Sequence, residues 1–104
     1  MILTHVIPKS ASADLREITK HSIERWGEAQ ARAYAQQIEA VAGKLATGQG
    51  VFKDLSAVLP GLRVKRAGHH YVFCMLRSGG PALILAILHE RMDIMARLKS
   101  RLEL

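Results

Sequence analysis

The stretch LRVKRAGHHYVFCMLRSGGPALILAILHER, residues 62–91, decides the fold. Its apolar runs are short, contain β-branched and aromatic residues, and are interrupted at Ala67 and Gly68 and again at residues 78–81. Short apolar runs bounded by glycine, serine and proline are typical of β-strands joined by tight turns. We therefore expect three consecutive strands and two turns in this part of the chain.

The two turns set the expected pairing of the strands. If Arg66 pairs with His69, and Ser78 with Pro81, side-chain alternation assigns every strand residue to one of two faces. The first face, which we expect to be the core face, collects Leu62, Val64, Tyr71, Phe73, Met75, Ile84, Ala86 and Leu88. The second face carries Arg63, Lys65, His70 and His89 at one end, beside Val72, Cys74, Leu83, Leu85 and Ile87. A bulge at either turn would slip this division by one residue.

Two consecutive helices are expected before the sheet. Residues 2–7 form a short apolar strand that Pro8 stops, since proline lacks the amide donor that a strand ladder needs. The first helix follows, with Ser10 or Ser12 as its cap. Its apolar stripe is Leu15, Ile18, Ser22 and Trp26, and after one glycine a second stripe follows at Ala31, Tyr34, Ile38, Val41 and Leu45. Gly48 ends the second helix, and we expect the resulting antiparallel hairpin to cover the core face.

The remaining segments complete the predicted domain. Residues 48–61 are too apolar for a free loop, so we expect an irregular connection packed against the edge of the domain. A final amphipathic helix is predicted from Met92, Met95, Leu98 and Leu102, with Ile94 alongside. Because the last strand is apolar on both faces, this helix, a partner, or both must cover the second face. The expected fold class is α+β, with about four strands in a mostly antiparallel sheet, as a single domain over residues 1–104.

Composition narrows the possible functions. The chain of 104 residues has 15 Lys and Arg against 9 Asp and Glu, a net charge of +6. Such a charge attracts nucleic acid, acidic protein segments or anionic membrane surfaces. The single cysteine, Cys74, falls in a predicted strand, where we expect it to be buried, and excludes an internal disulfide. Neither a signal peptide nor a stretch of about 20 apolar residues is present, so we expect a soluble cytoplasmic protein.

The histidines are the residues best suited to chemistry. His69 and His70 are adjacent on a strand and point to opposite faces, so they do not chelate one metal, and no metal or cofactor is expected. His70 and His89 fall opposite one another in the expected register. The basic residues that accompany them are Arg63, Lys65 and Arg91. Two interpretations stay open, a solvated basic end of the sheet or an anion-binding site in which a histidine serves as acid or base.

Four pieces of sequence carry a resemblance to a known family. They are Ala13, Asp14, Leu15 and Ile18; Trp26, Gly27, Gln30, Ala31 and Tyr34; Gly68, His69, His70 and Tyr71; and ILHERMD at residues 87–93. In this order, over nearly the whole chain, they resemble the toxins of the RelE/ParE superfamily, on the ParE side.

The resemblance implies the toxin of a type II toxin–antitoxin pair, with a strand, a helical hairpin and a mostly antiparallel sheet. It also implies a hetero-oligomer with a small cognate antitoxin, ParD-like or of another kind. For a ParE-like toxin, the implied target is DNA gyrase, and the toxin itself would have no enzymatic activity. RelE-like toxins instead imply ribosome-dependent cleavage of mRNA, and a third interpretation is a toxin fold that has lost toxicity and only binds its antitoxin.

The resemblance also assigns residues. Arg91 lies where RelE-like toxins carry a catalytic arginine, but Met92, Asp93 and the following helix replace the tyrosine that those nucleases use. We therefore predict a gyrase inhibitor and assign no catalytic residue. The alternative prediction is a ribosome-dependent endoribonuclease. The target-binding candidates are Arg63, Lys65, His70, His89 and Arg91. The apolar residues expected to form an exposed patch for the antitoxin are Val72, Leu83, Leu85 and Ile87.

Overall fold

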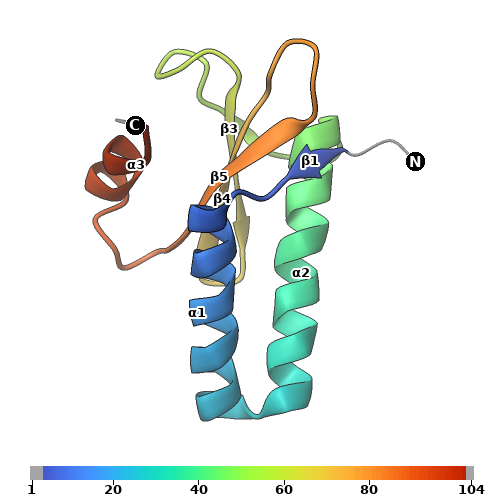
Figure 1. Ribbon diagram of the computed structural model, residues 1–104, viewed down its shortest axis with the longest axis vertical. Coiled ribbons are helices and arrows are strands. Elements are labelled where there is room, and N and C mark those ends of the chain that lie inside the picture. The colour runs from blue at the N-terminus through green and yellow to red at the C-terminus, as the bar shows by residue number, and fades with distance from the viewer. Residues whose placement is uncertain (1–3, 103–104) are drawn as a thin grey trace.

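Residues 4–102, which the computed structural model describes, form an α+β fold in which three helices pack against one five-stranded sheet (Figure 1). The elements are β1 His5–Val6, α1 Lys9–Trp26, α2 Glu28–Thr47, β2 Lys53–Asp54, β3 Leu62–Ala67, β4 His70–Met75, β5 Ala82–His89 and α3 Ile94–Leu102. The sheet order is β1-β5-β4-β3-β2, with β1 parallel to β5 and the other neighbours antiparallel. The expected α+β class is confirmed. The additional strand is β2, which pairs with β3 inside the segment expected to be irregular, and residues 2 and 3 of the expected first strand lie outside the described part.

Helices α1 and α2 form the expected antiparallel hairpin. Gly27 separates them with a φ of 92°, a backbone conformation that favours glycine, and Gly48 ends α2 in the left-handed region at 73°. Helix α1 begins directly after Pro8, whose carbonyl accepts a hydrogen bond from the backbone N–H of Ser12. Ser10 and Ser12 therefore lie inside the first turn, and the expected capping by either serine is wrong because proline already takes the position before the helix.

The pairing of β3 with β4 differs from the expected pairing by two residues. Ala67 lies opposite His70, so the turn consists of Gly68 and His69. A shift of two residues keeps every side chain on its expected face, because the alternation along a strand has a period of two. The pairing of β4 with β5 places His70 opposite His89, as expected.

A β-bulge interrupts the pairing of β4 with β5. Beyond Phe73 the pairing slips by one residue, so that Cys74 pairs with Ile84 and Leu85 becomes the extra residue. Ile84 therefore packs on the face of Cys74, while Leu83 and Leu85 pack on the opposite face. The expected faces of these three β5 residues are wrong, because a bulge reverses the alternation on one side of it.

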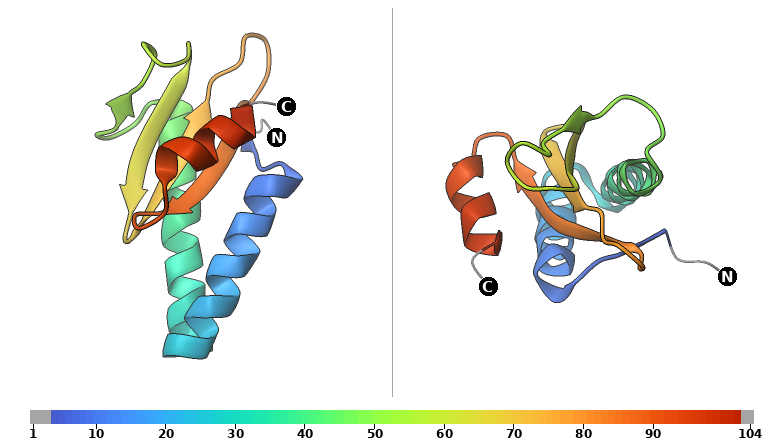
Figure 2. Two further views of the ribbon diagram at one scale, coloured as in Figure 1. Left: turned by 90° about the vertical axis from the view of Figure 1, so that its left-hand side faces the viewer. Right: turned by 90° about the horizontal axis from the view of Figure 1, so that it is seen from above.

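The helical hairpin covers the second face of the sheet. Val72, Cys74 and Ile87 pack there with Ile38 and Leu45 of α2. The hairpin lies against one face of the sheet and α3 lies against the other (Figure 2). The expectation that the hairpin covers the other face is wrong. Hydrophobicity could not choose between the faces, because β5 is apolar on both.

Helix α3 covers the face that was expected to lie under the hairpin. Leu98 packs there with Leu62, Phe73 and Leu88, flanked by partly buried side chains. The flanking residues on α3 are Ile94 and Leu102, whereas Met92 and Met95 are 44% and 68% exposed. The sheet is therefore the middle of three layers. Within the described residues, no helix is long and apolar enough to cross a membrane.

Candidate functional site

The basic face expected from the sequence divides into two separate groups. Arg63 and Lys65 form the first group, at the end of the sheet where α2 terminates. The Arg63 guanidinium donates from Nη1 to the Leu45 carbonyl at 2.8 Å and lies 4.5 Å from the centre of the Phe52 ring. Lys65 donates from Nζ to the Val51 carbonyl at 2.5 Å. Both cations therefore stabilise the carbonyl-rich end of α2 and the connection that follows it.

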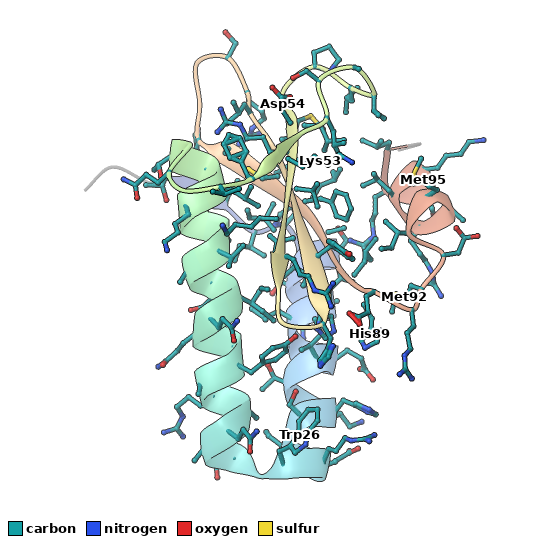
Figure 3. The ribbon with its side chains drawn as sticks, turned by 180° about the vertical axis from the view of Figure 1, so that it is seen from behind. Trp26, Lys53, Asp54, His89, Met92 and Met95 are labelled. Atoms are coloured by element: carbon teal, nitrogen blue, oxygen red, sulfur yellow. The ribbon has the colours of Figure 1, made fainter. Side chains whose placement is uncertain are left out.

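These two residues do not join the histidines as expected. Arg63 lies opposite Cys74, four residues along β4 from His70, which corresponds to roughly 13 Å of strand. Figure 3 shows Lys53, at the Arg63 end of the sheet, well away from His89. The alternation of side chains placed all of these residues on one face, but it contained no information about contacts along the strands.

The second group is a histidine cluster at the opposite end of the sheet. It consists of His69, His70 and His89, and we call it the histidine cluster below. The rings of His70 and His89 are nearly perpendicular, at 87°, with centres 5.0 Å apart. The ring of His69 lies 6.4 Å from that of His89 and is tilted by 24° to it. Within the described residues, no group of three His, Cys, Asp or Glu side chains is arranged to hold a metal ion.

Tyr34 of α2 positions the cluster. Its hydroxyl donates to the Ala67 carbonyl at 3.1 Å, accepts the backbone N–H of His69 at 3.0 Å, and lies 2.6 Å from Nδ1 of His70. A Cβ on Gly68 would lie 2.5 Å from the Tyr34 ring, and Gly68 also has a φ of 60°. Only glycine therefore fits this turn. We expected Tyr34 to be simple core packing, and sequence alone gave no signal of its polar role.

Glu90 offsets the positive charge around the cluster. Its carboxylate pairs with the Arg66 guanidinium and lies 3.3 Å from Nδ1 of His69. The hydrogen bond from His69, together with the charges of Arg66 and the histidines, lowers the pKa of Glu90. Arg91 is exposed, and its backbone N–H donates to Nδ1 of His89 at 3.0 Å. Neither Arg66 nor Glu90 was among the predicted site residues, although Glu90 directly follows His89.

His70 is the most perturbed of the ionisable groups at this end. Burial, followed by the neighbouring His89 and His69, lowers its pKa from 6.5 to about 4. At neutral pH the ring is therefore uncharged, with roughly one molecule in a thousand protonated. His70 is consequently unsuited to holding an anion by charge or to acting as a general acid near pH 7.

The exposed patch expected to bind an antitoxin is absent. Val72 and Ile87 are 0% and 3% exposed beneath the helical hairpin. Leu85 is 6% exposed, and Leu83 is partly buried in the cluster that α3 covers. The prediction that these four residues form one exposed surface is wrong. The bulge places Leu83 and Leu85 on the opposite face from Val72 and Ile87, and the hairpin and α3 each cover one of the two faces.

An apolar groove beside α3 is exposed instead. It has a volume of about 540 Å³ and is lined by Val58, Asp93, Met95, Ala96, Leu98, Lys99 and Leu102. Val58 and Met95 are 57% and 68% exposed, high values for large apolar side chains. Figure 3 shows Met95 on α3, away from His89. The sequence predicted that Met95 belongs to a packed stripe and that Val58 packs against the edge of the domain, and both predictions are wrong.

Comparisons with known proteins are consistent in pointing to one family. The family described as ParE toxin of type II toxin–antitoxin system, parDE, matches residues 6–94. The chain is 50% identical over 99 residues to Toxin ParE of Escherichia coli, covering 95% of this chain and 96% of that protein. It is 33% identical over 92 residues to Toxin ParE1 of Caulobacter vibrioides, covering 88% of this chain and 94% of that one.

A solved structure shares the fold. It is described as the chromosomal ParDE TA system from P. aeruginosa, and it superposes with a TM-score of 0.67 at 22% sequence identity. The match covers 85% of this chain and 96% of that one. The order of helices and strands therefore agrees with a fold already seen in a toxin–antitoxin system.

Proposed function

Because the chain belongs to the ParE toxin family of type II toxin–antitoxin systems, we propose that it arrests growth in the cytoplasm by binding DNA gyrase. The observation that carries this proposal is the 50% identity to a ParE toxin across nearly the whole chain. As the family resemblance implies, gyrase inhibition requires binding and no chemical step by the toxin. A cognate antitoxin encoded beside the toxin would hold it inactive in a hetero-oligomer.

His70 is poorly suited to one of the two proton-transfer roles that a nuclease needs. Cleavage of RNA through its 2′-hydroxyl needs a base and an acid within hydrogen-bond reach of the reacting oxygens. His70 is uncharged near pH 7, and Nδ1 of His89 is occupied by the Arg91 backbone. His70 therefore does not supply the general acid, and of the two candidate histidines only His89, through its Nε2, is left for that role.

Three of the five target-binding candidates remain together at this end of the sheet. His70 and His89 are paired on adjacent strands, and Arg91 follows directly with an exposed side chain. The guanidinium of Arg91 is suited to an acidic or carbonyl-rich protein surface. We assign the gyrase contact to this end, and assign Arg63 and Lys65 to stabilising the end of α2.

The groove beside α3 is suited to the antitoxin. The side chains that line the groove are mostly apolar, and the cationic Lys99 is among them. The chain as a whole carries a net charge of +6. Among the described lining residues the acidic side chain is Asp93, and its carboxylate already accepts the Ala96 backbone N–H at 3.2 Å. An amphipathic antitoxin segment with acidic flanks would bury the apolar side chains and match the charge.

Two assays run in parallel on the purified chain test the proposal. One follows the supercoiling of relaxed plasmid by gyrase, and the other follows mRNA cleavage on programmed ribosomes. We expect loss of supercoiling without cleavage, and recovery of supercoiling when cognate antitoxin is added. Cleavage of mRNA with unchanged supercoiling would establish the ribosome-dependent nuclease instead.

A further inference from the structure

We propose that His70 and His89 form a two-point site for a carboxamide group of the target protein, in which Nε2 of His70 accepts a hydrogen bond and Nε2 of His89 donates one. The inference deepens the proposed function, since it takes the target to be a protein. It names the chemical group that this end of the sheet recognises. A backbone peptide, or the side chain of Asn or Gln, supplies such a group.

Tyr34 determines which nitrogen of His70 carries the proton. The hydroxyl has one proton and two acceptor positions, and it has three partners. The Ala67 carbonyl can only accept and the His69 backbone N–H can only donate, at 3.1 and 3.0 Å. All three contacts are satisfied together only when Nδ1 of His70, at 2.6 Å, donates to the hydroxyl oxygen. Since His70 is uncharged at neutral pH, its Nε2 is left as a bare acceptor.

The backbone determines the opposite arrangement in His89. The Arg91 backbone N–H points at Nδ1 of His89 at 3.0 Å. A backbone N–H can only donate, so Nδ1 of His89 must be the bare nitrogen and Nε2 carries the proton. The two neighbouring rings therefore present one acceptor and one donor.

Both Nε2 atoms are open to a ligand. Neither has a hydrogen-bond partner among the described residues, and no buried side-chain nitrogen or oxygen in that part of the chain lacks a partner. Both atoms must therefore contact solvent. The ring centres are 5.0 Å apart and His70 lies opposite His89 on the adjacent strand, so one small ligand can contact both rings.

An anion fits this pair poorly. A phosphodiester or carboxylate has only acceptors near neutral pH, so it offers no donor to Nε2 of His70. The Glu90 carboxylate, paired with Arg66 and close to His69, adds repulsion nearby. A carboxamide is uncharged and carries its donor and acceptor side by side, which matches the two rings.

The first test is the tautomeric state of the isolated chain, which needs no target. Nitrogen-15 NMR of the histidine rings at pH 7 should show the proton on Nδ1 of His70 and on Nε2 of His89. Tyr34→Phe should convert His70 toward the Nε2 tautomer, whereas the control Tyr71→Phe should leave both rings unchanged. A wild-type His70 protonated on Nε2, or a cationic His70 at pH 7, would overturn the proposal.

The second test uses small probes and the same resonances. Acetamide should shift the Nε2 signals of both histidines, whereas N,N-dimethylacetamide and acetate, which only accept hydrogen bonds, should leave the Nε2 signal of His70 unchanged. A two-bond site of this size should bind in the millimolar range or more weakly, so each probe is titrated to about 1 M. A larger shift of the His70 Nε2 signal with acetate than with acetamide, or no shift with acetamide, would overturn the assignment to an amide. Larger shifts with adenosine than with acetamide would also overturn it, in favour of a nucleobase. These outcomes are independent of whether the chain inhibits gyrase.

Discussion

Asp14 and Arg101, 87 residues apart in the chain, join α1 to α3 through a two-point ion pair with Nη1–Oδ2 at 3.0 Å and Nη2–Oδ1 at 2.6 Å. Arg101 also donates to the Leu85 carbonyl at 3.1 Å, and Asp14 accepts the Ile87 backbone N–H at 3.0 Å. Strand β1 pairs only with residues 82 and 83 of β5. The ion pair therefore satisfies backbone groups on the edge of β5 that β1 leaves uncovered.

Removal of this pair should destabilise the fold. Arg101→Ala leaves the Asp14 carboxylate, whose side chain is only 16% exposed, without its ion-pair partner. It also removes the donor to the Leu85 carbonyl. We expect the free energy of unfolding to fall by about 2 to 4 kcal/mol, measured by chemical denaturation. Arg97→Ala, an exposed position on the same helix, is the matched control and should change it by less than about 0.5 kcal/mol. Equal effects of the two substitutions would show that the ion pair contributes nothing.

Arg63 should matter for stability, contrary to its expected role as a free surface charge. Arg63→Ala removes the hydrogen bond to Leu45 and the contact with the Phe52 ring. We expect a loss of about 1 to 2 kcal/mol in denaturation experiments. Arg16→Ala, an exposed residue of α1, should be close to neutral. A fully stable Arg63→Ala variant with reduced toxicity would return Arg63 to the target-binding surface.

Stability should fall as the pH is lowered from 7 to 5. The unfolded chain binds a proton on His70 near pH 6.5, whereas in the folded chain the pKa is about 4. The unfolded state therefore binds more protons between these values, and acidification favours it. Because His70 is only half-buried and solvent screens it, we expect a contribution of about 1 to 2 kcal/mol. Chemical denaturation of wild type and His70→Gln at both pH values isolates the contribution of His70 to the free energy of unfolding. An identical pH dependence in the two proteins would contradict this prediction.

The groove beside α3 should be required for antitoxin binding. Met95→Asp places a charge on its apolar floor and should weaken the complex with the cognate antitoxin by roughly 10- to 100-fold in calorimetric titration. Ile23→Asp changes a comparably exposed apolar residue on α1 and should leave the affinity unchanged. If Ile23→Asp is the more damaging substitution, the antitoxin docks on the hairpin.

Periodicity predicted much of the architecture, since its signals are local. The alternation in β3 and β4 assigned the faces correctly, and it survived a register shift because two residues restore the same side. Gly27 and Gly48 marked the breaks in the hairpin. Cys74 is buried, as expected for an apolar position in a central strand.

Contacts between residues far apart in the chain could not be predicted from the periodicity of the sequence. Nothing local to Asp14 indicates a partner on α3, and nothing near Leu85 indicates the bulge that displaces Leu83 and Ile84. Trp26 has helical spacing typical of a packed residue, yet it is 52% exposed because it lies at the tip of the hairpin, beyond the sheet (Figure 3). The pairing of His70 with His89 was predicted, but the Tyr34 hydroxyl that sets its chemistry was not.

The most direct test of gyrase as the target is a supercoiling assay with purified gyrase and relaxed plasmid, titrated with the isolated chain. If gyrase is the target, we expect a dose-dependent loss of supercoiled product that cognate antitoxin reverses and that Arg91→Ala weakens. Undiminished supercoiling at a large molar excess of folded toxin, over the range in which the same preparation cuts mRNA on ribosomes, would contradict it.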